Sequence, residues 1–443
     1  MQYKISTYCT LFCTPEGKTY AYLATDNSLL EISRDCYRLL MNFHKKKLFS
    51  KEDLRKSNIP VEFIERGVIT TIEDEDIYIR AKKLEMRMSS MSKEKLILVI
   101  APTTECNFAC PYCFEENKEN VFMSDETIDA LVHFVKEFKD SKYLHLTWYG
   151  GEPLLAIKTI EKILVGFKDN APEKEIIFNF LVTNGYLVNQ KVINVFQEFP
   201  LDRIQVTIDG EKERHNATRC LKSNGKGTFD KIVENIGLLL HSLEKTNIHV
   251  RVNIDKNNVN DYILIRDLLE SKYSNYRERL NVYPGIIRIE DKKNKCMGCE
   301  SLLHDDIRNL FFNIKERVNF YPVLQGKGCF ATHLNSFMIG PKGELYKCWN
   351  ELGDKKKIIG DIFSGITNVD LMTRYIVSAN CFDDPMCKDC KHLPICSGGC
   401  AYYRIKNIYE DSNYNICSLY KGVGVLEKCL MNHLAKISNN KVL

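Results

Sequence analysis

The chain has 443 residues, which is enough for two or three domains, and its 44% hydrophobic and 27% charged residues are an ordinary globular composition. Its 62 basic and 58 acidic residues leave a net charge of only +4, which argues against a nucleic-acid partner because such proteins carry a strong basic excess. The stretch Met1–Cys13 has no basic head or long apolar run, and no segment approaches the roughly 20 apolar residues that cross a bilayer. We therefore expect a cytoplasmic protein that does not contact a membrane.

Residues 1–91 predict a small winged-helix-like domain, in which strands are followed by three short helices and a further strand. Two strands flank a Pro15-Glu16-Gly17 turn, and Ser50 with Asp53 resembles a helix N-cap. The mostly polar stretch Leu84–Lys93 is the expected linker. The expected strands are Tyr3–Cys13, Thr19–Asp26 and Val68–Ile72, and the expected helices are Ser33 to about Phe43, Ser50 to about Lys56, and Val61–Arg66.

Residues 92–290 alternate between apolar, strand-like runs and amphipathic, helical stretches, which predicts βαβ units and a parallel sheet. Six such units give an α/β partial (β/α)6 TIM-like barrel rather than a closed barrel of eight. The strands are expected at Leu96–Ala101, Leu144–Trp148, Ile176–Val182, Ile204–Ile208, Ile248–Ile254 and Leu280–Ile287. The helices are expected at Asp125–Phe138, Ile157–Phe167, Gln190–Phe196, Phe229–Leu243 and Val259–Leu269. Ligands of this architecture bind at the carboxyl ends of the strands.

Residues 291–443 lose this alternation and contain 11 of the 18 cysteines, from Cys296 to Cys429. Disulfides are rare where thiols are kept reduced, so clustered cysteines in a cytoplasmic protein more often bind metal. We therefore expect this region to fold around metal rather than around an apolar core. Scattered cysteines such as Cys36, Cys220 and Cys429 are expected to be small, buried apolar residues.

Three cysteines, Cys106, Cys110 and Cys113, follow the first barrel strand in one short loop. Their thiolates can hold three corners of a [4Fe–4S] cluster and leave one iron open, although a zinc or structural-cluster loop is the competing interpretation. The spacing, with Tyr112 before the last cysteine, resembles the signature of the radical S-adenosylmethionine superfamily. That resemblance implies that S-adenosylmethionine chelates the open iron and is cleaved to a 5′-deoxyadenosyl radical.

Further motifs follow the later strands in the order that this family shows. Gly150-Gly151-Glu152-Pro153 resembles the motif that receives the amino group of the cofactor, and glycines allow a ligand to approach the backbone closely. Thr183-Asn184 follows the third strand, and the run from Thr207 and Asp209 through His215 to Arg219 follows the fourth. The resemblance implies that the cofactor contacts are Tyr112, Gly150, Gly151, Glu152, Thr183, Asn184, Thr207, Asp209, Arg219 and Asn253.

The C-terminal cysteines resemble the SPASM domain, which carries two auxiliary [4Fe–4S] clusters, making three clusters in all. A zinc ribbon is the competing interpretation of the same spacing. The resemblance implies a first auxiliary cluster on Cys329, Cys348 and Cys400, and a second on Cys387, Cys390, Cys396 and Cys417. Three alternatives remain for the fourth ligand of the first auxiliary cluster: Cys296, Cys299, or no cysteine, which would leave one iron open. No catalytic base is identified, and the candidates are Glu115, Glu116, Tyr149 and His333.

The N-terminal segment resembles a RiPP recognition element, which implies that it captures the leader of a ribosomally made precursor peptide by β-augmentation. A structural cap on the barrel is the competing interpretation. The whole chain thus resembles a peptide maturase that installs a thioether or C–C cross-link and takes electrons from a flavodoxin- or ferredoxin-like donor. Alternatives are oxidation of a cysteine or serine on a protein, as in sulfatase maturation, a non-catalytic peptide escort, and a zinc-stabilised interaction protein. Trp349 stands where the sulfatase-maturing branch has an aspartate, which disfavours the first alternative.

Overall fold

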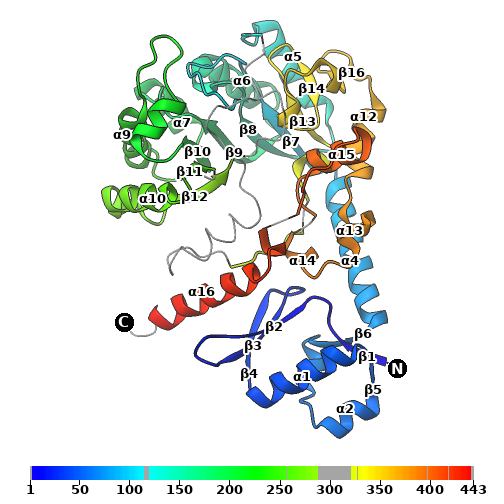
Figure 1. The fold of residues 1–443 in the computed structure, drawn as a ribbon. Coiled ribbons are helices and arrows are strands. Elements are labelled where there is room, and N and C mark those ends of the chain that lie inside the picture. The colour runs from blue at the N-terminus through cyan, green and yellow to red at the C-terminus, as the bar shows by residue number, and fades with distance from the viewer. Residues whose placement is uncertain are drawn as a thin grey trace. The chain divides into compact units, whose positions relative to one another are not determined.

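The computed structural model describes residues 2–113, 119–255, 257–287, 321–326, 328–396, 398–417 and 419–440. The chain forms two compact units, each assembled from segments distant in the sequence (Figure 1). The first unit comprises Met1–Met91, His304–Cys329 and Val377–Leu443, and the second comprises Ser92–Leu303 and Phe330–Ile376. Among the described residues, no helix is both long and apolar enough to cross a membrane.

The second unit contains a ten-stranded sheet whose first six strands in chain order are parallel neighbours. The prediction of an α/β partial barrel is confirmed, since each of the six expected strands forms close to its expected bounds. They are β7 (Lys95–Ile100), β8 (Tyr143–Trp148), β9 (Glu175–Thr183), β10 (Arg203–Ile208), β11 (Asn247–Ile254) and β12 (Leu280–Ile286).

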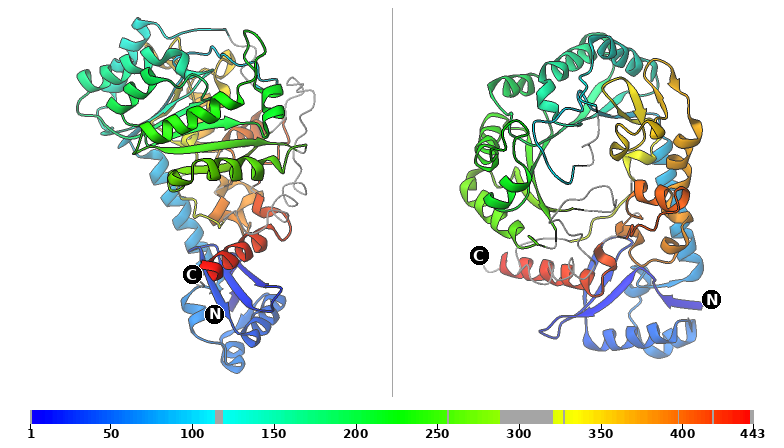
Figure 2. Two further views of the ribbon diagram at one scale, coloured as in Figure 1. Left: turned by 90° about the vertical axis from the view of Figure 1, so that its left-hand side faces the viewer. Right: turned by 45° about the horizontal axis from the view of Figure 1, so that its top comes forward.

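Helices cover the outer face of this curved sheet, as the cyan and green elements in Figure 2 show. Alternate side chains of a strand point to opposite faces, and β8 illustrates the result: Leu146 and Trp148 are fully buried whereas His145 and Thr147 are half-buried. The half-buried side chains, His145 and Thr147, therefore line the concave face of the sheet, opposite the helices. All five expected helices form, and a short sixth, α8, was missed: α5 (Asp125–Glu137), α6 (Ile157–Asn170), α7 (Gln190–Glu198), α8 (Lys212–Thr218), α9 (Phe229–Ser242) and α10 (Asp261–Lys272).

The sheet continues beyond β7 with strands from much later in the chain. Strand β13 (Ser336–Ile339) pairs in parallel with β7, and β14 (Glu344–Tyr346), β15 (Gly360–Asp361) and β16 (Gly365–Ile366) follow antiparallel. A short helix, α12 (Val369–Thr373), comes next. Because β13 is completely buried, the prediction of a region without an apolar core is wrong for residues 336–366.

The N-terminal part of the first unit has two three-stranded antiparallel sheets, in the orders β2-β3-β4 and β5-β1-β6. The predicted Ser50 cap is present as a full capping box with Asp53. Residues 84–91 belong to one 20-residue helix, because Leu, Glu, Met and Arg are strong helix formers and dominate this stretch. The boundary between the two units follows Met91, inside the expected linker Leu84–Lys93. The elements are β1 (Gln2–Ile5), β2 (Cys9–Cys13), β3 (Thr19–Leu23), β4 (Ser28–Ile32), α1 (Arg34–Lys46), β5 (Phe49–Ser50), α2 (Lys51–Ser57), α3 (Glu62–Glu65), β6 (Ile69–Thr71) and α4 (Ile72–Met91).

The C-terminal part of the first unit is helical and packs onto the sheet of β2 and β3. Its helices are α13 (Pro385–Lys388), α14 (Leu393–Cys396), α15 (Ala401–Tyr409) and α16 (Val425–Asn440). The aromatic side chains of Tyr8, Phe12, Tyr20 and Tyr22 form one hydrophobic cluster with side chains of this region, which we call the shared core; its C-terminal members include Cys381, Leu393, Ile395, Leu426 and Leu430. The N-terminal sheet and the cysteine-rich region are thus one folding unit.

Candidate functional site

The loop that carries Cys106, Cys110 and Cys113 begins at the carboxyl end of β7 and is held by backbone hydrogen bonds. Ala109 N–H donates to Cys220 O at 3.1 Å, and Cys113 N–H donates to Cys110 O at 3.2 Å. Burial raises the pKa of Cys106 to about 12, and the neighbouring thiols Cys110 and Cys113 add to that rise. None of the three is in a disulfide bond, and a bound metal would reverse this pKa shift by stabilising the thiolates.

This donor set fits an iron–sulfur cluster better than a mononuclear ion. Among the described residues, no three His, Cys, Asp or Glu side chains converge closely enough to hold one metal ion. A [4Fe–4S] cluster binds each thiolate at a different iron, so its ligands need not meet at one point. Thiolates are also the soft ligands that iron–sulfur clusters select.

The glycine pair after β8 lies directly against the segment that enters the cysteine loop. Gly151 N–H donates to Thr103 O at 3.2 Å, and Glu152 N–H donates to Glu105 O at 2.8 Å. A side chain at Gly151 would place its Cβ 2.2 Å from Glu105 O, and Gly150 has a φ of +114°. Both positions therefore require glycine, because the two backbones are in contact.

Glu152 connects the ends of β8 and β9 rather than facing open space. Its carboxylate is fully buried and accepts hydrogen bonds from Leu154 N–H (3.0 Å), the Thr183 hydroxyl (2.7 Å) and Asn184 N–H (2.7 Å). Burial raises the pKa of Glu152, and these hydrogen bonds oppose the rise. The Asn184 amide in turn donates to Asn107 Oδ1 at 2.8 Å, which extends the network into the cysteine loop.

Four of the predicted cofactor residues meet in a buried polar cluster at the ends of β10 and β11. The Tyr112 hydroxyl donates to the Asp209 carboxylate and accepts from Arg219 Nη1 at 2.9 Å. Asn253 Nδ2 donates to Asp209 Oδ1 at 3.0 Å, and the Arg219 guanidinium lies over the Phe108 ring at 5.5 Å. We call Tyr112, Asp209, Arg219 and Asn253 the polar cluster. Thr207 lies two residues before Asp209 on β10, paired in register with Arg251.

Two buried donors in and next to the polar cluster, Arg219 Nε and Asn107 Nδ2, make no hydrogen bond with the residues that the structure describes. Leaving a buried donor unsatisfied costs about 1–3 kcal/mol, and more when it is charged. A ligand that presents acceptor oxygens, such as the carboxylate of an amino acid, would satisfy both. Asn107 was not predicted as a site residue, because its burial and its unpaired donor depend on the tertiary structure and cannot be inferred from the local sequence.

His215, the histidine of the Asp-Gly…His…Arg run, positions this cluster without lining it. Its Nδ1 accepts from Asp209 N–H at 3.2 Å, and its Nε2 lies 3.0 Å from the Thr228 hydroxyl, which donates to Arg219 O at 2.7 Å. The ring is fully buried, and burial lowers the pKa of His215 to about 3. The neutral imidazole thus fixes the backbone of both charged cluster residues.

We expect acid to destabilise the fold through His215. Its folded-state pKa lies below the ordinary value of 6.5, so the unfolded chain binds the proton more readily. The free energy of unfolding should therefore fall as pH drops below about 6.5, by up to about 1.4 kcal/mol per pH unit. Urea unfolding at pH 7 and pH 5 should show a smaller pH effect in His215→Gln than in wild type. The exposed control His133→Gln should keep the wild-type effect, and an equal effect in all three proteins would contradict this assignment.

The four cysteines predicted for the second auxiliary cluster line one pocket of the first unit. Cys387, Cys390, Cys396 and Cys417 share it with residues that include His392 and Lys421. Arg404 Nη2 donates to Cys387 Sγ at 3.4 Å. Burial raises the pKa of Cys387 to about 12, with the other cysteines of the pocket adding to the shift. Four thiols around one pocket are the donor set of a [4Fe–4S] cluster.

The remaining predicted residues are distributed as follows. Cys329 and Cys400 belong to the first unit and Cys348 to the second. Trp349 stacks on Tyr149 with ring centroids 5.4 Å apart, beside the Gly150-Gly151 turn. This aromatic pair was not predicted, since it joins β8 to a loop 200 residues later. Cys296, Cys299, Glu115 and Glu116 lie outside the described residues.

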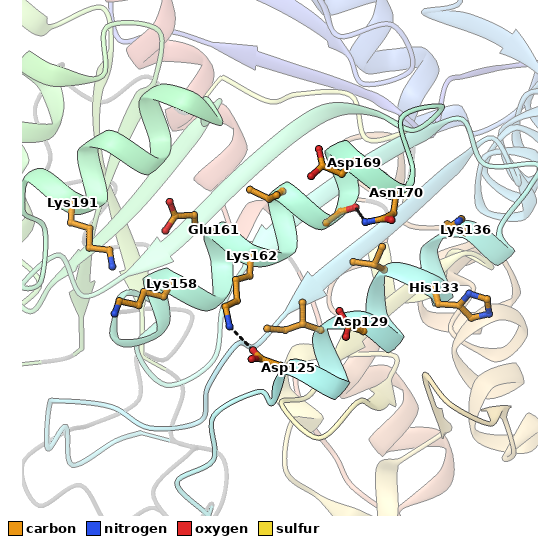
Figure 3. Close-up of a pocket in the computed structure, with 14 residues that line it drawn as sticks. Asp125, Asp129, His133, Lys136, Lys158, Glu161, Lys162, Asp169, Asn170 and Lys191 are labelled. Atoms are coloured by element: carbon orange, nitrogen blue, oxygen red, sulfur yellow. Dashed lines mark hydrogen bonds and ion pairs between the residues drawn. The ribbon is translucent and has the colours of Figure 1, made fainter.

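A large open hollow of the second unit, of about 860 Å³, lies between α5 and α6 and contains none of the predicted site residues. Figure 3 shows it lined by charged side chains of these helices, among them the ion pair of Lys162 with Asp125 at 2.6 Å. Such a groove between two surface helices, lined by solvated charges, has no feature of an active site.

Residues 100–269 match the Radical SAM superfamily model. With the partial barrel and its strand-end motifs, the match identifies residues 100–269 as a radical SAM domain and the chain as an enzyme. A radical SAM domain uses S-adenosylmethionine and a [4Fe–4S] cluster, so both belong to this protein.

Among individual proteins, the chain is 26% identical to a cysteine-type anaerobic sulfatase-maturating enzyme of Clostridium novyi, over 74% of this chain and 94% of that one. It is 22% identical to the radical SAM cyclopropyl synthase TigE of Paramaledivibacter caminithermalis, over 98% of this chain and 96% of TigE. The structure of SuiB of Streptococcus suis bound to its precursor peptide SuiA aligns with a TM-score of 0.53 and 15% identity, over 95% of this chain and all of that one.

Proposed function

We propose that the chain is a peptide maturase that installs an intramolecular cross-link, either a thioether or a C–C bond, in a ribosomally made precursor peptide. The observation that carries this proposal is the first unit, in which the three-stranded sheet β2-β3-β4 and the region of the cysteine-lined pocket share one core. SuiB, which was solved with its precursor peptide, aligns over 95% of the chain. The sulfatase-maturating relative aligns over only 74% of it.

We assign the radical-generating cluster to Cys106, Cys110 and Cys113. When bound, this cluster and S-adenosylmethionine supply a 5′-deoxyadenosyl radical that abstracts hydrogen. The chain's part is to bind and orient: the unpaired Arg219 Nε and Asn107 Nδ2 suit the carboxylate of the cofactor. The contacts proposed for the cofactor are Tyr112, Gly150, Gly151, Glu152, Thr183, Asn184, Thr207, Asp209, Arg219 and Asn253.

Two auxiliary clusters are part of the proposal. The second is assigned to Cys387, Cys390, Cys396 and Cys417, which line one pocket. The first is assigned to Cys329, Cys348 and Cys400. Forming a cross-link removes two hydrogen atoms from the peptide, one by the radical and one as an electron and a proton. An electron acceptor is therefore needed in addition to the flavodoxin- or ferredoxin-like donor that supplies the reducing electron.

The leader of the peptide is proposed to bind an edge of the β2-β3-β4 sheet. Both β2 and β4 are edge strands of this sheet, so each has backbone groups available to a further strand. Holding the leader there would raise the effective concentration of the segment to be modified. The domain assignment that goes with this is 1–91 for leader recognition, 92–290 for the radical SAM barrel, and 291–443 for the bridging segment and auxiliary clusters.

The position after Cys348 disfavours sulfatase-type oxidation. The family pattern for that reaction places an aspartate there as base, and this chain places Trp349, whose ring stacks on Tyr149. An indole has no carboxylate to accept a proton from a substrate. The aromatic pair instead offers an apolar surface beside the glycine turn.

The test is reaction of the reconstituted enzyme, under anaerobic conditions, with dithionite, S-adenosylmethionine and a candidate precursor peptide, which is to be sought among short reading frames beside the gene. We expect mass spectrometry to show loss of two hydrogen atoms per cross-link, and only when the leader is present. The matched controls are the same peptide without its leader and a cysteine-containing sulfatase peptide. Oxidation of the sulfatase peptide, with the precursor unchanged, would contradict the proposal.

A further inference from the structure

One buried histidine in the first unit has a polar atom without a partner. His392 is 5% exposed, and its Nδ1 is buried and makes no hydrogen bond within the part of the chain that the structure describes. In the sequence it directly precedes Leu393, a member of the shared core. It also lines the pocket formed by Cys387, Cys390, Cys396 and Cys417. Burying an unpaired imidazole nitrogen in this way costs free energy, which a hydrogen bond made inside the pocket would recover.

The same pocket is surrounded by nitrogen donors on other sides. Arg404 is 2% exposed and donates to Cys387 Sγ at 3.4 Å, while its other contacts are the Asp384 carboxylate and Gly398 O. The Lys421 ammonium hydrogen-bonds Cys417 and lines the pocket. Two of the four cysteines thus already receive hydrogen bonds from cationic side chains, and His392 adds a third nitrogen-bearing residue, in the lining of the pocket.

We propose that His392 donates an Nδ1–H hydrogen bond to a sulfur atom of the iron–sulfur cluster held by these four cysteines. The inference rests on the proposed function, which supplies that cluster. His392 is a positioning residue in this role: it is not a ligand, since four cysteines complete the ligand set. Its effect is on the reduction potential, because hydrogen bonds to cluster sulfurs stabilise the reduced form, which carries more negative charge.

The test uses the full-length protein with Cys106, Cys110 and Cys113 changed to Ala, so that signals of the radical-generating cluster are absent. In this background, His392→Phe replaces the imidazole with an apolar ring, and His392→Asn keeps a side-chain N–H close to the position of Nδ1. His44→Phe is the matched control, because His44 is exposed on α1 of the same unit. Each protein is reconstituted, its iron is counted, and its clusters are titrated by EPR.

We expect His392→Phe to keep its iron but to lower the equilibrium constant for reduction of one cluster about tenfold, which is about 59 mV for one electron. An exchangeable proton coupled to that cluster, seen by ENDOR after transfer to deuterated buffer, should disappear in the same variant. His392→Asn should restore most of the potential, and His44→Phe should match the parent.

Two results would overturn the inference. One is a potential and a proton coupling that do not change in His392→Phe. The other is loss of about four irons in both His392 variants, which would make the residue a requirement for cluster assembly. A Cys387→Ala/Cys390→Ala/Cys396→Ala/Cys417→Ala variant separates this from failure of the proposed function. If that variant loses no iron, the cluster itself is absent.

Discussion

Replacing Cys106, Cys110 and Cys113 with alanine should abolish formation of 5′-deoxyadenosine. The three thiols are the only cysteines on the loop after β7 in the described residues, and a cluster with no protein thiolate on this loop has nothing to hold it. Iron should fall by about four per chain, while the iron of the proposed auxiliary clusters should remain. The measurement is chromatography of 5′-deoxyadenosine after anaerobic reconstitution, with iron and sulfide counted in the same samples.

Cys220→Ala is the matched control for this experiment. Cys220 lies beside the loop, and its backbone oxygen accepts from Ala109 N–H at 3.1 Å, a bond that alanine preserves. That variant should keep both its iron and its activity. Zinc in place of iron in the wild type, or 5′-deoxyadenosine at the wild-type rate in the triple variant, would refute the assignment of the radical-generating cluster.

The second large effect is expected from Tyr22→Ala in the shared core. Tyr22 is completely buried and donates its hydroxyl to Asn27 Oδ1 at 2.8 Å. Removing a buried aromatic ring costs about 3–5 kcal/mol. Because the same core contains Leu393 and Ile395, which lie between the proposed ligands Cys390 and Cys396, the variant should also lose the iron of the proposed auxiliary cluster. The measurements are the midpoint of urea unfolding and the iron content after reconstitution.

Tyr37→Ala tests whether the iron loss is specific to the shared core. Tyr37 is a half-buried residue of α1 and is not a member of that core. It should cost less stability than Tyr22→Ala and leave the iron content unchanged. Full auxiliary iron in Tyr22→Ala would show that the N-terminal sheet and the cysteine pocket fold independently.

The barrel was predictable because its signals are local. Apolar runs such as Leu144–Trp148 alternate with amphipathic helices, which indicates successive parallel strands. Each predicted cofactor motif directly follows one of these strands, so the order of the motifs along the chain predicts the strand at whose end each motif lies. Strand β13 was missed because its partner β7 lies more than 200 residues earlier, and no local pattern reports such a pairing. Helix α4 was missed because its polar C-terminal half lacks an apolar stripe, although its residues favour helix.

The candidate site was predictable as a set of residues but not as a set of contacts. The Tyr112 hydroxyl meets Asp209, Arg219 and Asn253 only because the loop after β7 lies over the ends of β10 and β11. Glu152 was expected to face the cofactor, and the structure shows its carboxylate accepting three hydrogen bonds from neighbouring loops. The unpaired nitrogens of Arg219 and His392 depend on burial, which a single sequence does not report.

The discontinuous first unit has a consequence during synthesis. Strands β2 and β3 leave the ribosome early, whereas Leu393, Ile395 and Leu426, which cover their aromatic face, are made about 370 residues later. At a synthesis rate of 5–20 residues per second, that aromatic face stays uncovered for roughly 20–70 s. Nascent chains of this protein should therefore need protection from aggregation, and a chaperone that binds exposed aromatic strands would find its target within the first 30 residues.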